Sequence, residues 1–89
     1  MQQFLKDPDA VLDYGVDWSS WLQTAEAISS HTVTVDTGIT KDSDSETDGI
    51  VTVWLSGGTV GETYEITVRI ITDAGRTDDR TFSVLLVER

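Results

Sequence analysis

The feature that most constrains this sequence is an alternation of apolar and polar side chains between residues 64 and 86. In its first half the apolar residues fall at even positions: Tyr64, Ile66, Val68 and Ile70. A period of two is typical of a β-strand with one buried face. The second half also has its bulkiest side chains at even positions: Phe82, Val84 and Leu86. The stretch therefore predicts a long β-hairpin, from Gly61 to Val87, whose even-numbered side chains point inward.

The turn of this hairpin falls at Asp73-Ala74-Gly75. Residues that face each other across the hairpin point to the same side. Even-numbered residues can face even-numbered residues only if the loop between the strands has an odd number of residues. A three-residue loop places Gly75 at the left-handed position that such a loop prefers. The facing pairs are then Tyr64 with Val84, Ile66 with Phe82, and Arg69 with Asp79. The first two pairs set the register by burial, because the outward Arg69–Asp79 ion pair adds little.

Other parts of the chain alternate in the same way and predict further strands. They are residues 11–18, a segment from about Ile28 to Asp36, and residues 50–56. Residues 19–22 predict one helical turn, with Trp18 and Trp21 closing one end of the core. We expect a short strand at residues 39–40, followed by a mobile acidic loop over residues 41–49. The total is six or seven strands without a long helix, which is typical of a small antiparallel β-sandwich.

Composition excludes several classes of partner and site. The chain has sixteen acidic and six basic residues, a net charge of −10, which argues against nucleic acid and anionic membranes as partners. There is no cysteine, so disulfides and thiolate metal sites are ruled out. No apolar run approaches the roughly 20 residues that span a bilayer. The first residues do not combine a basic region with an apolar run, so we expect no signal peptide.

Catalytic and metal sites find little support in the sequence. His31 is the only histidine, and no nucleophile-elbow motif accompanies it, so we expect it to pack at a strand edge. The acids of residues 42–48 are spaced two apart, as ligands of a calcium loop can be. However, Thr47 occupies the position of the EF-hand glycine and Val53 that of its bidentate glutamate. We therefore predict a non-enzymatic protein with no cofactor and no metal, and interpret the acids as a solvated loop.

Two aromatic residues carry specific expectations. Tyr64 begins its strand just after Gly61-Glu62, where immunoglobulin-like folds place a tyrosine whose hydroxyl bonds to upstream backbone. Trp54 points away from the core if Val51 and Val53 face it, and Ile50 then shares its outer face. That pair forms either an exposed contact patch or part of a sheet that is covered on both faces.

Three stretches resemble a family of small phage and prophage proteins, described as tail or fibre–tail adaptor proteins with an immunoglobulin-like fold. They are KDPDAVLDY at residues 6–14 with DWSSWL at 17–22, VWLSGGTVGETY at 53–64, and TDAGRTDDR at 72–80. The resemblance covers most of the chain and is weakest from Gln23 to Ile50. It implies an N-terminal extended arm over residues 1–10 and a single immunoglobulin-like domain over residues 11–89.

The resemblance also implies a structural role in a virion that is assembled in the host cytoplasm. The partners would be other tail, fibre or capsid proteins, and several copies would occupy each particle. The residues expected at the contacts are Phe4, Leu5, Ile50, Trp54 and Arg76. The alternatives are a capsid decoration protein and a β-sandwich that binds a carbohydrate or receptor.

Overall fold

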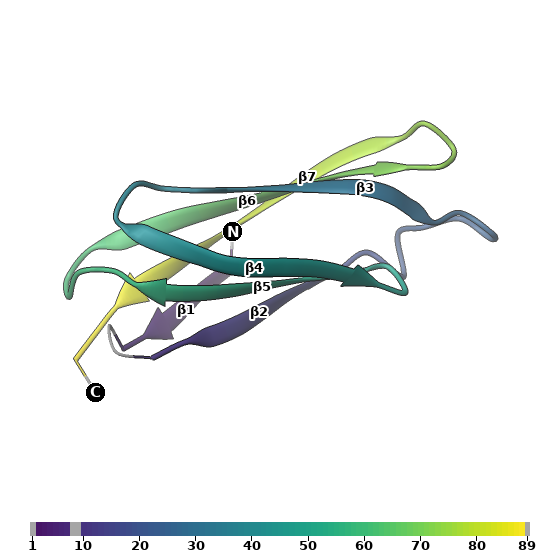
Figure 1. Ribbon diagram of the computed structural model, residues 1–89. Helices are drawn as coiled ribbons and strands as arrows, with labels where there is room; N and C mark the ends of the chain where they lie inside the picture. The colour runs from purple at the N-terminus through teal and green to yellow at the C-terminus, as the bar shows by residue number, and fades with distance from the viewer. Residues whose placement is uncertain (1, 8–9, 89) are drawn as a thin grey trace.

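The computed structural model describes residues 2–7 and 10–88, and these residues form β-strands and turns without a helix (Figure 1). The described strands are β1 (Gln2–Lys6), β2 (Leu12–Asp17), β3 (Ile28–Val35), β4 (Ile39–Thr47), β5 (Ile50–Gly57), β6 (Thr63–Thr72) and β7 (Thr77–Leu86). Among these residues, no helix could reach across a lipid bilayer. The prediction of an all-β chain with about seven strands is confirmed.

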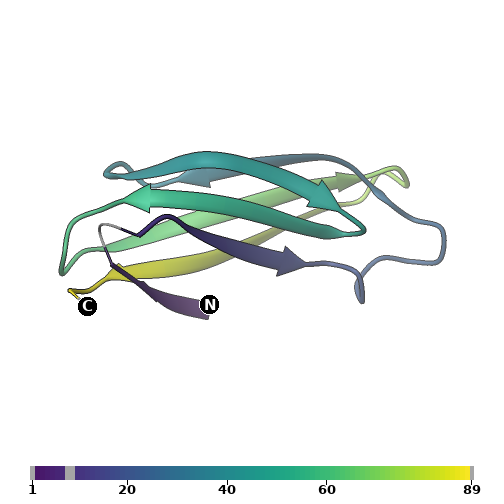
Figure 2. The same ribbon diagram turned by 60° about the horizontal axis from the view of Figure 1, so that its bottom comes forward.

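The strands form two sheets that pack face to face (Figures 1 and 2). The larger sheet has the order β1-β7-β6-β3, and the smaller has the order β2-β5-β4. All neighbouring pairs are antiparallel except β1 with β7, which run parallel. The predicted sandwich is therefore confirmed, and its first strand departs from a purely antiparallel arrangement.

The β6–β7 hairpin has the predicted register. Tyr64 pairs with Val84, Ile66 with Phe82, and Arg69 with Asp79. The turn occupies residues 73–75, with Gly75 at φ 84°. The apolar side chains predicted to point inward from β6 and β7 are all buried, and the even-numbered Asp78 and Arg80 are half-buried.

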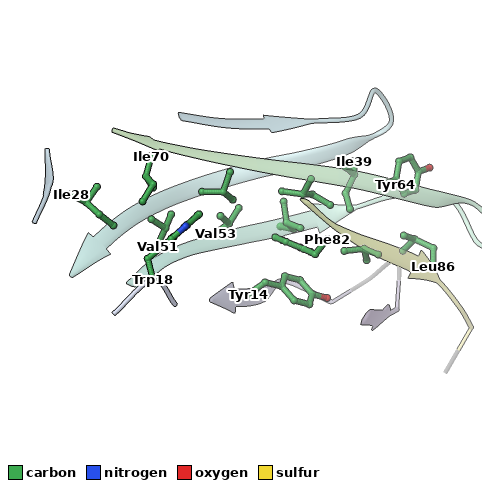
Figure 3. Close-up of a cluster of buried hydrophobic side chains, with 14 residues drawn as sticks. Tyr14, Trp18, Ile28, Ile39, Val51, Val53, Tyr64, Ile70, Phe82 and Leu86 are labelled. Atoms are coloured by element: carbon green, nitrogen blue, oxygen red, sulfur yellow. The ribbon is translucent and has the colours of Figure 1, made fainter. Parts of the chain in front are cut away.

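The core lies between the two sheets, and residues from both line it (Figure 3). Its members from the smaller sheet include Tyr14 and the alternating set Val51, Val53 and Leu55. Trp18 is fully buried and Trp21 packs against the cluster, so the predicted closure of one core end is confirmed. Residues 19–22 form a turn in which the amides of Trp21 and Leu22 both donate to the Trp18 carbonyl.

The prediction of a mobile loop over residues 41–49 is wrong. Residues 39–47 form the edge strand β4, which pairs with β5 and contains a bulge between Lys41 and Ser43. The turn is only Asp48-Gly49, with φ of 52° and 86°. Positive φ at both central residues is what a two-residue type I′ turn requires, and Asp-Gly is a preferred sequence for it. Polar residues are tolerated on both sides of β4 because an edge strand is open to water.

The strand order corresponds to the immunoglobulin arrangement over six strands. There, strands C, F and G form one sheet and B, E and D lie in the other, as β3-β6-β7 and β2-β5-β4 do here. The Tyr64 hydroxyl accepts a hydrogen bond of 3.0 Å from the amide of Thr59, as expected for a tyrosine at this corner. The first strand differs, because β1 joins the β7 side of the larger sheet.

The segment expected as an N-terminal arm, residues 1–10, is extended from Gln2 to Lys6. These residues pair with β7, so they form part of the sandwich. Lys6 is fully buried, and its ammonium donates to the carbonyls of Asp7 and Gly57. Met1, Pro8 and Asp9 within the expected arm, and Arg89 at the end of the expected domain, lie outside the described residues.

Candidate functional site

The two most exposed apolar side chains of β5 share the outer face of the smaller sheet. Ile50 and Trp54 are 38% and 41% exposed, while Val51, Val53 and Leu55 between and beside them are fully buried. This follows from the alternation of a strand in the middle of a sheet. The residues directly opposite in register share the face, and we call the set the Trp54 face: Asp13, Gly15, Asp17, Ser43, Ser45, Thr47, Ile50, Thr52 and Trp54.

The Trp54 face is acidic around its apolar side chains. Trp54 lies between Asp13 on β2 and Ser43 on β4, and Ile50 lies between Asp17 and Thr47. Hydrogen bonds from Ser19 hold the pKa of Asp17 below its ordinary value, so this carboxyl is charged at neutral pH. None of the described residues paired on this face is Lys or Arg.

The centre of the Trp54 face is nearly flat. Trp54 and Ile50 stand roughly 13 Å apart, since a strand rises about 3.3 Å per residue. Between them lie Thr52 and Gly15, and a Cβ built on Gly15 would lie 3.7 Å from the Ile50 Cγ2 atom. The face therefore presents two separate apolar contacts joined by small side chains.

On the opposite outer face, on the larger sheet, two pairs of polar side chains bind each other across β6 and β7. Arg69 and Asp79 form a two-point ion pair, with Nε–Oδ1 and Nη2–Oδ2 distances of 2.8 and 3.0 Å. The hydroxyls of Thr67 and Thr81 hydrogen-bond across the same two strands at 3.0 Å. These four side chains thus use their donors and acceptors within the protein.

The remaining expected contact residues do not join Ile50 and Trp54. Leu5 is 50% exposed on β1, a strand of the other sheet. Phe4 is half-buried and packs against Tyr14 and Phe82, with ring centroids 4.9 and 5.6 Å away. Phe4 therefore contributes to the core more than to the surface.

Arg76 lies at the tip of the β6–β7 hairpin and is held there by contacts within the chain. Its guanidinium stacks 3.9 Å from the centre of the Trp21 ring. Its Nε donates to Oε2 of Glu26 at 2.9 Å, and Thr72 donates to the same oxygen at 2.6 Å. The pKa of Glu26 is lowered to about 2, mainly by the hydrogen bonds from Arg76. The sequence signal for this pair is weak, because fifty residues separate its members.

The only histidine bridges the two sheets at one side of the sandwich. Nε2 of His31 on β3 lies 2.6 Å from Oδ1 of Asp44 on β4. Lys41 donates to the other oxygen of Asp44 and, as the largest cause, lowers the pKa of this carboxyl. Within residues 2–7 and 10–88, no serine hydroxyl is hydrogen-bonded to His31.

The acids of residues 42–48 are spread over both sides of β4 and its turn. Asp42 accepts a hydrogen bond from Ser56, and Asp44 is engaged as described above. Glu46 accepts from the amide of Gly49 in the adjoining turn. Among the described residues, no three His, Cys, Asp or Glu side chains are arranged to hold a metal ion.

A model of a protein family matches most of the chain. The family model described as podophage GP4 fiber-tail adaptor protein gp77 matches residues 6–85. No curated protein matches the chain. The match covers all of β2 to β6 and nearly all of β7, including the whole Trp54 face.

Proposed function

Because this chain belongs to the family of the podophage GP4 fiber-tail adaptor protein gp77, we propose that it binds another tail or fibre protein through its Trp54 face. The family is one of structural phage adaptors, so the protein is a virion component that interacts with other tail or fibre proteins. Its role in our proposal is mechanical and non-enzymatic. The β-sandwich holds the contact side chains in place, and the contacts join one virion protein to another.

The observation that carries the proposal is the exposure of Trp54 on a rigid, central strand. Tryptophan is among the residues that contribute most binding energy at protein interfaces. The strands β2 and β4 pair with β5 on both sides, so the backbone that carries Trp54 is held in place before a partner binds. A preorganised aromatic side chain costs little conformational entropy when a partner covers it.

The surroundings of Trp54 indicate the chemistry of this partner. Asp13 and Asp17 flank the two apolar side chains without a cation among the paired residues of the face. An interface with complementary charge would bring Lys or Arg to this rim and an apolar pocket to the indole. We therefore infer a partner surface with a basic rim around an apolar centre.

The alternative of carbohydrate binding receives less support. Small-molecule sites are concave, whereas Trp54 lies on the flat outer surface of a sheet. Two surface pockets, of about 460 and 490 Å³, include neither Trp54 nor Ile50, although the first reaches Gly15 and Asp17 at the border of the face. A capsid decoration protein would differ from a tail adaptor in its position in the particle. The family match favours the tail position over the capsid.

We further infer that the particle contains several copies and that assembly takes place in the host cytoplasm. The net charge of −10 supports the absence of nucleic acid and anionic membranes among the partners. Leu5 is a second candidate contact, on the opposite sheet, where it is half exposed. Phe4 and Arg76 would take part mainly by holding β1 and the hairpin tip in position.

The test is a pair of substitutions with equal exposure on different faces. Trp54 and Ile71 are 41% and 42% exposed, on the smaller and larger sheet respectively. We expect Trp54→Ala to weaken incorporation into particles by about 30-fold, which corresponds to the 2 kcal/mol of a typical hot spot. Ile71→Ala should change incorporation less than about twofold.

Incorporation would be measured by complementing a phage that lacks the gene and quantifying the protein in purified particles. Circular dichroism and thermal unfolding would verify that both variants fold like the wild type. Wild-type incorporation of a correctly folded Trp54→Ala variant would show that the Trp54 face is not the contact.

A further inference from the structure

The strand β3 leaves one side of its backbone unpaired. Among residues 2–7 and 10–88, it forms the end of the larger sheet and pairs only with β6. After a register shift near its start, the pairing is regular from Ser30 to Val35. An edge of this kind presents N–H and C=O groups that another strand can bind.

Compared with the other edge strands, β3 has few of the features that prevent strand addition. Charged residues, proline, bulges and short length all protect edges. β4 has a bulge and four charged residues, β2 contains two acids and Gly15, and β1 is only five residues long. The sequence of β3, ISSHTVTV, contains no Lys, Arg, Asp, Glu, Pro or Gly. It is also rich in the β-branched residues that favour strands.

The sandwich has room for another strand beside β3. In the correspondence given above, β3 is strand C, and variable-type immunoglobulin domains add their extra strands on this side of the sheet. Here the chain turns at residues 36–38 and continues as β4 in the other sheet, so that position is not filled by the described residues. Val33 and Val35 point inward but are only half-buried. An added strand would cover their open flank.

The charges around this edge define the occupant. β4 lies against β3 at the same side of the sandwich (Figure 1) and carries Asp42, Asp44 and Glu46 against a single cation, Lys41. Asp36 adds an acid at the end of β3. A second copy of the chain would bring the same acids to the contact and be repelled.

We propose that the β3 edge binds an extended, basic segment of a partner protein, which adds to the larger sheet as a strand. Lys or Arg at alternate positions of that segment would point inward. Their aliphatic stems would cover Val33 and Val35 while their charged ends approach Asp44 and Glu46. Backbone hydrogen bonds to β3 supply the affinity, and the acids of β4 select a basic segment.

The probe for this surface is a capped synthetic peptide of sequence KTKTKTK, compared with ETETETE. We expect saturable binding of the lysine peptide to the whole protein, with backbone NMR shifts centred on residues 30–35 and slower amide exchange there. The glutamate peptide should bind at least tenfold more weakly. Equal binding of the two peptides, shifts centred on another edge, or no saturation at millimolar concentration would each overturn the proposal.

A matched pair of variants tests the role of β4. Glu46→Gln keeps the acceptor for the Gly49 amide and should weaken the lysine peptide about two- to fivefold. Glu65→Gln removes one charge from the exposed surface of β6 and should change the affinity by less than its measurement error. Equal losses in both variants would mean that net charge alone attracts the peptide and would overturn the assignment to this edge.

Two measurements separate this surface from others. Trp54→Ala should bind the lysine peptide like the wild type, so the two proposed contacts can fail independently. NMR spectra of the chain alone should not change at residues 30–35 as the concentration is raised. Concentration-dependent shifts there would identify a second copy as the occupant and overturn the proposal of a basic partner.

Discussion

The hairpins β4–β5 and β6–β7 enclose the same core from opposite sheets, but inward charge is spread along β4 and is confined to the half of β7 near the tip. In β6–β7, the inward positions of both strands near Tyr64 and Phe82 are buried and apolar. Nearer the tip, the buried residues of β6 pair with Asp78 and Arg80. In β4–β5, buried Val51 and Val53 pair with Glu46 and Asp44. The charged positions are at sheet edges, because β4 ends its sheet and β1 lies beside β7 only at residues 82–86. An inward charged side chain is tolerated at the edge of a sheet, because it can reach water past the last strand.

The tips of both hairpins lie at the same end of the sandwich (Figures 1 and 2), and the segment of residues 18–27 joins them. The amide of Trp18 donates to the carbonyl of Gly49 at 2.8 Å. Glu26 binds Arg76 and Thr72 at the tip of β6–β7. The β6–β7 tip is also attached through backbone, since the amide of Asp73 donates to the carbonyl of Ala27 at 2.9 Å, and the largely buried Glu26 carboxylate is an additional link. Substitutions in the strands and in the tips of the two hairpins test this comparison.

The largest expected difference concerns the side chains that each hairpin buries. Ile66 is fully buried on β6, whereas Ile50 is 38% exposed on β5. Ile66→Ala leaves a cavity in the core and should lower the free energy of unfolding by about 2–5 kcal/mol. Ile50→Ala should lower it by roughly 0.5 kcal/mol, as for surface substitutions. Equilibrium urea unfolding measures both losses, and losses of equal size would contradict the assignment of the core to the even positions of β6.

A smaller difference is expected between the two turn glycines. Gly49 and Gly75 have nearly equal φ angles, 86° and 84°, so alanine at either costs about 1–2 kcal/mol for the left-handed conformation. A Cβ on Gly49 would lie 3.0 Å from Leu22 Cδ1 and 3.4 Å from Ser19 Cα, whereas nothing lies within 4 Å at Gly75. Gly49→Ala should therefore be less stable than Gly75→Ala by about 1 kcal/mol. Thermal unfolding of the two variants side by side would measure this, and the reverse order would show that residues 18–22 do not pack closely on the turn.

The strands that could be predicted from the sequence are those with one buried face. The alternation in β6 and β7 fixed even the register, because a shift by one residue would expose Ile66 and its neighbours. The same reasoning placed Trp54 and Ile50 together on an outer face. Burial of one side is thus enough to predict both a core position and its exposed neighbour.

The strand and contacts that could not be predicted lack this periodic signal. β4 has polar residues on both sides, and its strongest local signal, Asp48-Gly49, was interpreted as part of an acidic loop. The partners of Arg76 and Lys6 lie about fifty residues away in the chain. Local spacing carries no information on such pairs, so Arg76 was expected at a contact although its guanidinium is held by Glu26.

The smallest expected effect appears only in acid, at the tip of β6–β7. The pKa of Glu26 is about 2 in the folded protein against 4.5 for an ordinary glutamate, chiefly because of the hydrogen bonds from Arg76. A lowered pKa in the folded state means that the unfolded chain binds the proton first. The stabilisation is therefore complete above pH 4.5 and is lost as the pH falls toward 2.

Thermal midpoints measured between pH 6 and pH 2 should fall less steeply for Glu26→Gln than for the wild type. Asp17, Asp44 and Asp79, whose pKa values are also lowered, contribute a decline that both proteins share. Parallel curves would show that Glu26 does not hold the hairpin tip through its charge.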